Sequence, residues 1–346
     1  MRKILFAIIF FVLLCFTLPL IFTERPKVQA IAEENIVESN NTDNNEGYTY
    51  TKYGTVKLLH NETGEVVELP MEEYLYGVVA AEMPANYETE ALKAQATVAR
   101  TYTSYKILKG SKHEGADICD NPSCCQAWIS KESRFEKWNE ADRESNWNKI
   151  TSAVNTTAGD IITYNGEPIN AFFHSSSGGT TETVSNVWGG TDYPYLQSIE
   201  TSGEEGYTQY SSSLQLTKEE LIEKIKIRYP EAVIDFSIEN PIQILEYTDS
   251  GRVKTIKFGS INISGVEARE IFGLKSAKFS IEIGENVIFN VTGNGHGVGL
   301  SQTGADAMAK AGATYNQIIN HYYTDVKIEK LWIESINLVN NLTKEN

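Results

Sequence analysis

One glutamate, Glu82, occupies a position where a predicted helix should carry an apolar side chain. In a helix, Leu75, Val78 and Val79 fall on one face, and Glu82 continues that face one turn later. Pro84 stops the helix within two residues, at a break where a cleft can open. Partial burial raises the pKa of a carboxylic acid, so Glu82 could stay protonated near neutral pH and give a proton to a leaving oxygen. The alternative is a glutamate that turns back to solvent at the helix end, and this segment alone leaves both readings open.

The next predicted helix carries two cations whose spacing matters. Lys93 and Arg100 are seven residues apart, which is nearly two helical turns, so they share a face. The opposite side is mostly apolar and should pack inward. The two cations form either an ordinary solvated basic face or a positive strip beside Glu82 that orients substrate oxygens.

A polar loop ends a predicted strand at His174 and continues through Gly179. Ser175, Ser176 and Ser177 supply three hydroxyl groups, and two glycines then allow a ligand to approach closely. A serine nucleophile activated by His174 is conceivable, but side chains adjacent in sequence rarely reach that geometry. We therefore expect a loop that binds hydroxyl and amide groups of a sugar.

A second loop alternates glycine with other residues from Gly293 to Gly299. Such glycines adopt positive φ and let a ligand or another backbone approach closely. The loop is either a tight connector into the next helix or a ligand-contacting segment. His296 and Gln302 bring functional groups to it, which favours ligand contact.

A short loop between residues 110 and 130 contains His113, Cys119, Cys124 and Cys125. One imidazole and three thiolates suit tetrahedral zinc, although the spacing is not that of a paired C-x2-C motif. The alternative is a disulfide between Cys119 and Cys125, which would leave one thiol unpaired. The odd number of cysteines in this loop favours the metal, and the chain's fourth cysteine, Cys15, lies in the apolar run near the N-terminus.

Composition excludes several classes of function. The chain has 346 residues, 41% of them hydrophobic, and a formal net charge of −16. Phosphate backbones are bound by clustered Lys and Arg, so nucleic acid is not an expected partner. No P-loop pattern occurs in the sequence, and the glycines near residue 295 do not have the spacing of a dinucleotide loop. A neutral or weakly charged substrate fits this acidic chain best.

The N-terminus carries a membrane signal. Two basic residues precede an unbroken apolar run from Ile4 to Phe22, which spans roughly 28 Å as a helix. We expect residues 1–22 to be a signal-anchor that leaves the rest of the chain outside the cytoplasm. A cleaved signal peptide ending at Ala30 is the alternative, but the run is long for one. Residues 23–47 are acidic and rich in asparagine, which is typical of a flexible linker.

The remaining chain predicts an α+β fold of mostly antiparallel hairpins with segregated helices. Turn signals predict hairpins that turn at residues 61–64 and at 165–166, with Asn165 and Gly166 forming the second turn. Thr89 and Ser264 are the expected caps of two helices. The predicted helices cover residues 71–82, 89–109, 131–155, 218–228 and about 303–323. We expect one extracytoplasmic domain over residues 48–336, a stretch at about 205–290 that could form an appended α/β subdomain, and a tail at 337–346.

Three long segments, taken together and in order, resemble the stage II sporulation protein D family, membrane-anchored lytic transglycosylases of endospore-forming bacteria. The resemblance covers about residues 50 to 330. It is carried by Tyr74 to Ala85 with Glu90 to Tyr102, by His174 to Gly179 with Val187-Trp188-Gly189, and by Gly293 to Ala305 with His321-Tyr322-Tyr323.

The resemblance implies cleavage of peptidoglycan strands between N-acetylmuramic acid and N-acetylglucosamine, with a 1,6-anhydro-muramyl product. The family's catalytic glutamate falls on Glu82. Its substrate-cleft residues fall on Lys93, Arg100, His174, the serines 175–177 and Gln302, and we add His296. It implies a glycan-binding cleft, peptide-stripped strands as substrate, and action at the cell membrane with a sporulation amidase and the membrane-anchored engulfment complex. It also implies a structural Zn²⁺ held by His113, Cys119 and Cys125. Relatives commonly have a His just before the last Cys, where this chain has Cys124; because a thiolate can replace an imidazole at zinc, we expect Cys124 to be the fourth ligand.

Two rival functions follow from the same residues. A hydrolytic muramidase would need a second carboxylate, for which Asp192 and Glu182 are the candidates. A protein that binds peptidoglycan and stimulates an amidase, as relatives described as amidase enhancers do, would need no catalytic acid. The presence of Glu82 favours an enzyme.

Overall fold

The structure is a computed structural model that describes residues 54–331. The predicted anchor at residues 1–22, the linker at 23–47 and the tail at 337–346 lie outside the described residues. Between residues 54 and 331, no helix is both long enough and apolar enough to cross a membrane.

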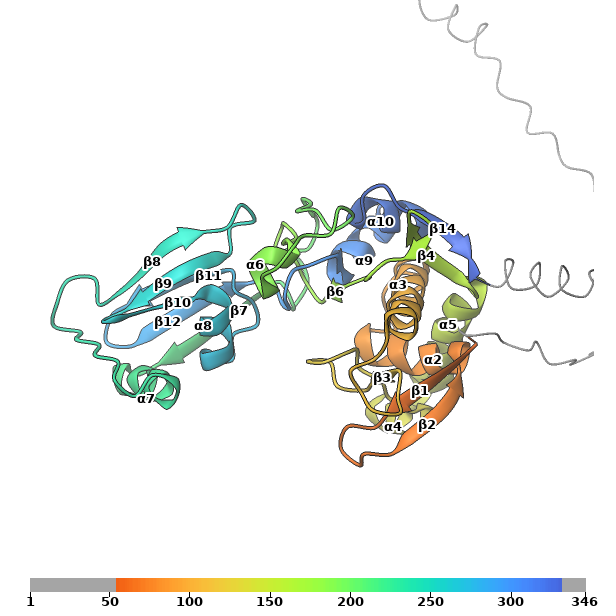
Figure 1. Cartoon of the computed structure of the whole chain (residues 1–346), viewed down its shortest axis with the longest axis horizontal. Coiled ribbons are helices and arrows are strands. Elements are labelled where there is room, and N and C mark those ends of the chain that lie inside the picture. Colours follow the sequence, from red (N-terminus) through yellow and green to blue (C-terminus); the bar gives the residue numbers. More distant parts are fainter. Residues whose placement is uncertain (1–53, 332–346) are drawn as a thin grey trace, which may run out of the picture. The chain divides into compact units, whose positions relative to one another are not determined.

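A long central helix, α3 (Thr89–Lys109), organises the first hydrophobic core. α2 (Met71–Glu82), α5 (Arg143–Thr156), α9 (Gln302–Lys310) and α10 (Tyr315–Tyr322) pack around it (Figure 1). Alanines along α3 let these neighbours come close, and nearly every side chain between Ala91 and Ser104 is buried. The prediction that α3 has a solvent-facing or substrate-facing basic side at Arg100 is therefore wrong, because neighbouring elements cover that side too.

Small sheets flank this helical core. The hairpin of β1 (Thr55–Leu59) and β2 (Val66–Pro70) is antiparallel, and β3 (Ile118–Cys119) pairs with β1 in parallel. A second sheet has the order β14-β4-β5, formed by β14 (Lys327–Lys330), β4 (Asp160–Tyr164) and β5 (Glu167–Pro168). Asn165 and Gly166 have φ of 53° and 80°, so the expected two-residue turn with both residues at positive φ is confirmed.

A second hydrophobic core forms from residues 216–291, around Phe258, Phe272 and Phe289. Two three-stranded antiparallel sheets, β10-β9-β8 and β11-β12-β7, build it together with two helices. The elements are β7 (Ser211–Leu216), α7 (Lys218–Arg228), β8 (Ile242–Tyr247), β9 (Val253–Phe258), β10 (Ile261–Ser264), α8 (Gly265–Phe272), β11 (Phe279–Ile283) and β12 (Val287–Thr292). The described part of the chain is thus α+β, with several small and mostly antiparallel sheets.

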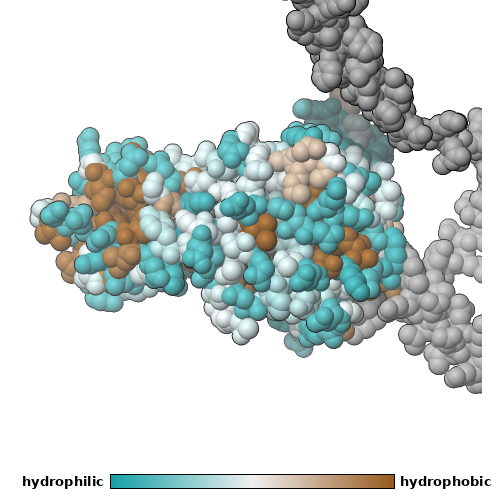
Figure 2. Space-filling view, turned by 90° about the horizontal axis from the view of Figure 1, so that it is seen from above, coloured by the Kyte–Doolittle hydropathy of each residue, from teal (hydrophilic) through white to brown (hydrophobic). Residues whose placement is uncertain are grey.

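Between residues 54 and 331, most of the large exposed apolar side chains belong to elements and loops of this second core, and Figure 2 shows apolar surface gathered there. They are Ile227, Val233, Ile238, Leu245, Tyr247 and Ile283. None of them lines the cavity described below.

Two predicted helix features differ from the structure. The helix expected over residues 131–155 is broken into α4 (Lys131–Lys137), a 3₁₀ turn (Glu140–Asp142) and α5, because Trp138 adopts an extended backbone and packs on Phe135. The residue that caps α3 is Glu88 and not Thr89. The Glu88 side chain does not bond the helix end, but the Glu88 amide donates to Asp306 Oδ1 of α9 at 2.6 Å. The cap at Ser264 is confirmed, since its hydroxyl accepts from the Glu267 amide.

Candidate active site and metal centre

Two loops distant in sequence are joined by backbone hydrogen bonds at the centre of the site. β6 (Phe173–His174) runs parallel to β13 (Leu300–Ser301), and Ser176 exchanges two backbone hydrogen bonds with Asn294. Gly295 has a φ of 111°, and a Cβ there would lie 2.8 Å from the Cβ of His174. The glycine-rich loop therefore does allow another backbone to approach closely, as expected, and that backbone belongs to the polar loop after β6.

A cavity of about 280 Å³ opens beside the joined loops. Its walls come from the end of α2, from α3, from the cysteine-containing loop, from β6, from α8 and from the start of α9. The lining residues are Glu82, Tyr102, Pro122, Cys125, Phe172, Phe173, His174, Ser175, Arg269, Gly295, His296 and Gln302.

Glu82 is the last residue of α2, and its carboxyl group is held inside this cavity. The helix ends because Met83 is extended and Pro84 follows it. Burial raises the pKa of Glu82 to about 7, although the Ala127 amide and the Gln302 side chain act to lower it. The Ala127 N–H donates to Oε1 at 2.6 Å, which fixes one carboxyl oxygen. Near neutral pH a large part of the Glu82 population is protonated and can act as an acid.

Two histidines in the cavity wall are neutral, and their Nδ1 atoms have opposite roles: one donates a hydrogen bond and the other accepts one. Burial lowers the pKa of His174 to about 4, and burial likewise lowers the pKa of His296. His174 Nδ1 lies 3.1 Å from the Val298 carbonyl, so it carries the proton and leaves Nε2 as an acceptor. His296 Nδ1 instead accepts from the Val298 amide. His174 Nε2 has no partner among the described residues, and it is a ready acceptor for a ligand hydroxyl.

Gln302 reaches the cavity from the first turn of α9. Ser301 caps this helix through the Gly304 amide, and Gln302 Nε2 donates to Gln95 Oε1 of α3 at 3.3 Å. The amide group is therefore oriented by α3 next to Glu82. Of the sequence-predicted substrate residues, the structure brings His174, Ser175, His296 and Gln302 to the cavity of Glu82, and the others do not line it.

The other two serines of the polar loop, Ser176 and Ser177, are buried in the protein interior. Ser177 is fully buried, and its hydroxyl and amide both donate to Glu204, at 2.6 and 3.1 Å. Ser176 is buried as well, with no hydrogen-bond partner for its hydroxyl among residues 54–331. The expectation that Ser176 and Ser177 contact sugar is corrected on this basis, because a loop of three serines can expose only some of its hydroxyls.

Glu204 is an organising carboxylate that the sequence did not reveal. It also accepts from Ser301, from Thr303 at 2.8 Å and from the Gly179 amide at 3.1 Å. Burial acts to raise the pKa of Glu204, but these hydrogen bonds outweigh it and lower the pKa to about 2. One charge therefore holds the loop after β6 to the loop before α9.

The two cations predicted to orient substrate lie elsewhere. Arg100 is fully buried and forms an ion pair with Glu72 at 2.6 Å, while its remaining donors bond the carbonyls of Val154 and Asp160. Lys93 pairs with Glu90 at 2.7 Å. Neither lines the cavity, so we correct the assignment of both: Arg100 ties α3 to its neighbours, and Lys93 makes a local pair on α3.

Neither candidate for a second catalytic carboxylate reaches Glu82's cavity. Glu182 accepts from Thr248, Ser250 and Asn186, and Asp192 accepts from the amide and hydroxyl of Ser185. Among the residues that line the cavity, Glu82 is the only carboxylic acid. This arrangement suits chemistry that uses one carboxyl group.

Aromatic residues and one cation of the cavity were not expected from the sequence. Phe172 and Phe173 directly precede His174, which was a usable signal, since a strand leading into a site places its neighbours there too. Tyr102 lies on the apolar side of its helix, which was expected to pack inward. Arg269 lies outside all of the motifs, 24 residues before Gly293, on an ordinary amphipathic helix. No local pattern could have assigned either residue to the cavity.

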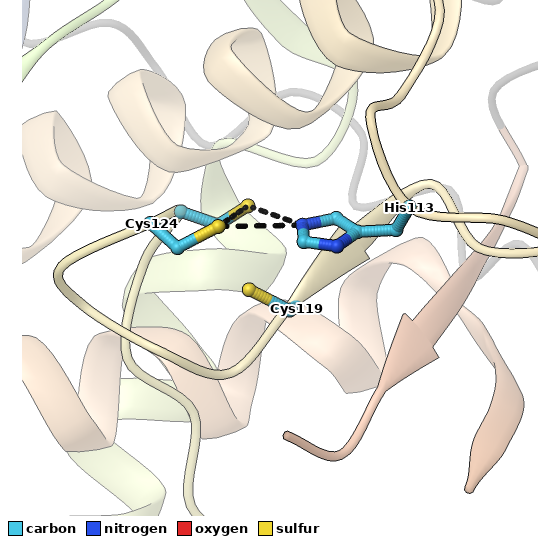
Figure 3. A group of neighbouring side chains, drawn as sticks. His113, Cys119 and Cys124 are labelled. Atoms are coloured by element: carbon cyan, nitrogen blue, oxygen red, sulfur yellow. Dashed lines mark hydrogen bonds between the residues drawn. The ribbon is translucent and has the colours of Figure 1, made fainter. Parts of the chain in front are cut away.

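The predicted metal ligands do converge. The ligand atoms of His113, Cys119, Cys124 and Cys125 all lie within 4.8 Å of one another (Figure 3). His113 Nε2 is 3.4 Å from the sulfur of Cys124 and from that of Cys125, and the two sulfurs are 3.8 Å apart. Tetrahedral zinc with ordinary bond lengths places its ligand atoms about 3.5–3.8 Å apart, close to these three separations, and Cys119 lies near enough to be the fourth ligand.

The same loop connects the cysteines to Glu82. The three cysteines of this loop are free thiols, so the alternative disulfide between Cys119 and Cys125 is not formed. Cys125 lines the cavity, and two residues later the Ala127 amide bonds the Glu82 carboxyl group. Four protein ligands leave no open position for water, so a zinc ion here would hold the loop and perform no chemistry.

We predict that protein purified without added metal contains stoichiometric zinc and that a chelator loosens this loop. Cys119→Ser should abolish zinc binding, lower the melting temperature and speed hydrogen exchange at the Ala127 amide, because metal binding stabilises only the folded loop. Ser123→Ala, in the same loop, is the control and should change none of these. A metal-free protein with a slowly exchanging Ala127 amide would contradict the site.

Comparison with known proteins identifies the family. Residues 59–164 match the family described as SpoIID, stage II sporulation protein. The chain is 34% identical over 281 residues to stage II sporulation protein D of Bacillus subtilis, covering 80% of this chain and 79% of that protein. The Bacillus amyloliquefaciens protein of the same name is 33% identical over 279 residues, with the same coverage. A Bacillus subtilis protein named amidase enhancer is 30% identical over 300 residues, or 72% of this chain and 39% of that protein. This chain belongs to the SpoIID family.

Proposed function

We propose that this protein is a lytic transglycosylase that cleaves peptidoglycan between N-acetylmuramic acid and N-acetylglucosamine. The observation that carries the proposal is Glu82, a carboxylic acid with a pKa raised to about 7 by burial, alone of its kind in the lining of a cavity of about 280 Å³. Hydrolytic glycosidases ordinarily use two carboxyl groups. A reaction that uses the sugar's own hydroxyl as nucleophile needs only one.

The proposed reaction uses the same carboxyl group twice. Glu82 first protonates the glycosidic oxygen, and the bond from that oxygen to C1 of the muramic acid breaks through an oxocarbenium-like state. The Glu82 carboxylate then takes the proton of the C6 hydroxyl, whose oxygen bonds to C1. N-acetylglucosamine leaves with a free hydroxyl, the muramic acid keeps a 1,6-anhydro ring, and Glu82 ends protonated as it began.

The cavity wall supplies groups suited to hold the sugars. His174 Nε2 offers an acceptor and Gln302 offers an amide oriented by Gln95, while Ser175 adds a hydroxyl. Phe172 and the half-exposed Trp188 of α6 (Val184–Trp188), whose ring centroids are 4.8 Å apart, present apolar ring faces beside His296. Sugar rings stack on such faces because their C–H groups are apolar.

Digestion of purified peptide-free strands tests the proposal. Mass spectrometry should find products that lack one water relative to reducing ends. The rate should be flat below pH 7 and fall about tenfold per pH unit above it, because the first step needs protonated Glu82 and its pKa is about 7. Reducing ends in place of anhydro ends would instead indicate a hydrolytic muramidase.

The resemblance to an amidase enhancer supports a second candidate, a protein that binds peptidoglycan and stimulates an amidase. Strand binding without any cleavage by the purified protein, together with faster release of stem peptides by an added amidase, would favour it.

The cellular setting is part of the proposal. We place the protein in the cell membrane, anchored through residues 1–22, with the bulk of the chain in the space between mother cell and forespore. Its partners there would be the glycan strands, a sporulation cell-wall amidase and the engulfment complex. An amidase that removes stem peptides would supply the uncrowded strands that a cavity of this size can admit.

A further inference from the structure

The cavity contains one permanent positive charge, and it comes from the second core. Arg269 of α8 lines the cavity together with Glu82. His174 and His296, the other nitrogen bases of the wall, are neutral. The wall that faces a bound strand therefore combines one proton donor with one guanidinium group.

The guanidinium group of Arg269 is fixed in place and has donors to spare. Its Nε donates to the Leu274 carbonyl at 3.3 Å, and the Leu274 amide returns a bond to the Arg269 carbonyl at 2.9 Å. The chain turns back after α8, and so brings Leu274 to Arg269, because Gly273 adopts the left-handed conformation, with φ of 68°. Within residues 54–331 its two terminal nitrogens form no hydrogen bond or ion pair, so a full edge of the guanidinium remains for a ligand.

In contrast, the neighbouring Arg252 has its guanidinium group hydrogen-bonded to acceptors of the protein itself. Arg252 donates to the carbonyls of Thr180 and Ser177 at 2.8 and 2.9 Å, and to the Ser250 hydroxyl at 2.8 Å. Its charge is also close to Glu182 and Glu204. Among residues 54–331, Glu270 is the acid whose charge acts on the pKa of Arg269, and the Glu270 carboxylate already pairs with Arg228 at 3.1 Å. Arg269 forms no ion pair within the same residues, so its positive charge is available to attract an anion.

We propose that Arg269 binds the lactyl carboxylate of the N-acetylmuramic acid residue and thereby selects peptide-free strands, an inference that rests on the proposed function. A carboxylate matches the free edge of the guanidinium in a two-point, charge-assisted interaction. In a peptide-bearing strand the same carboxyl carbon is part of a neutral amide, which offers one acceptor and no charge. N-acetylglucosamine has no lactyl group, so Arg269 also distinguishes the two sugars and sets the register of the strand.

Binding in the Glu82→Gln background tests this without any cleavage. Calorimetry would compare peptide-free muramyl oligosaccharides with the same oligosaccharides after their lactyl carboxylates have been converted to primary amides. Arg269→Gln should weaken binding of the carboxylate form about 10- to 100-fold and leave binding of the amide form unchanged. Arg269→Lys keeps the charge but loses the two-point geometry, so its loss should be smaller.

Arg228→Gln is the matched control, because it removes the same charge from the second core at a site outside the cavity. It should bind both forms like the parent. Equal weakening of both forms by Arg269→Gln, or no weakening of either, would overturn the role of Arg269. A protein that binds strands in this way but never cleaves them would overturn the proposed activity while leaving Arg269 as the carboxylate ligand. A parent that binds neither form would overturn both.

Discussion

Glu82→Gln is expected to reduce the rate of strand cleavage by about 10³- to 10⁴-fold. Glutamine has nearly the same shape and can still accept the Ala127 hydrogen bond, but it can neither donate a proton to the glycosidic oxygen nor remove one from the C6 hydroxyl. General acid–base catalysis contributes about 10²–10⁴-fold in rate. The loss should lie near the upper end of that range because one group performs both transfers and no other carboxyl group lines the cavity.

The measurement is the initial rate of anhydro-end formation from peptide-free strands, followed by mass spectrometry. Glu73→Gln is the matched control, since Glu73 is an exposed acid on the same helix. It should cleave at the parent rate. Both variants should melt near the parent temperature. If Glu82→Gln retained more than a tenth of the parent rate, the carboxyl group could not be the proton donor and the proposed mechanism would fail.

Glu204→Ala is expected to destabilise the fold by about 3–5 kcal/mol. The substitution leaves the hydroxyls of Ser177, Ser301 and Thr303 and two backbone amides without their common acceptor, in the interior of the protein. Breaking a fully buried charged network costs about this much because the stranded donors have lost water without gaining a partner. Urea unfolding should show a lower midpoint. Glu205→Ala, at the exposed neighbouring position, should unfold like the parent.

The same carboxylate predicts how stability changes in acid. The pKa of Glu204 is about 2 in the folded protein and near its ordinary value of 4.5 in the unfolded chain. The unfolded state therefore takes up the proton first, and the stabilisation by Glu204 is complete above about pH 4.5 and lost as the pH falls toward 2. Unfolding of the parent should become easier across this window by about 3 kcal/mol more than unfolding of Glu204→Ala. Parallel stability curves for the two proteins would contradict the assigned network.

Local sequence patterns were sufficient to predict features whose conformation is set by residues adjacent in the chain. Asn165 and Gly166 formed the expected turn, and the capping signal at Ser264 was correct, because a few adjacent residues fix those conformations. Glu82 was located correctly as a partly buried acid at a helix end, since the spacing of Leu75, Val78 and Val79 and the break at Pro84 contain that information.

The misplaced residues share a different physical cause. Arg100 looked solvent-facing from its helical spacing, but spacing shows only which side chains share a face and not what covers that face. In the folded protein an acid from α2 and backbone carbonyls from α5 and β4 reach that side of α3. The direction of Ser176 and Ser177 was equally undecidable, because it follows from the pairing with Asn294 and from the burial of Glu204.

The sequence by itself indicated the buried acid Glu82 at a helix end, the four His and Cys side chains that converge, the helices and hairpins that carry them, and the family. These depend on residue type and on short-range spacing. Only the tertiary structure decided that the polar loop after β6 joins the glycine-rich loop and that Glu204 holds the two together. It also decided that Arg269 lines the cavity, whereas Lys93 and Arg100 do not. Those outcomes depend on contacts between distant segments, some of them more than 180 residues apart in the sequence. Such contacts are set by the packing of two hydrophobic cores and leave no periodic signal in the chain.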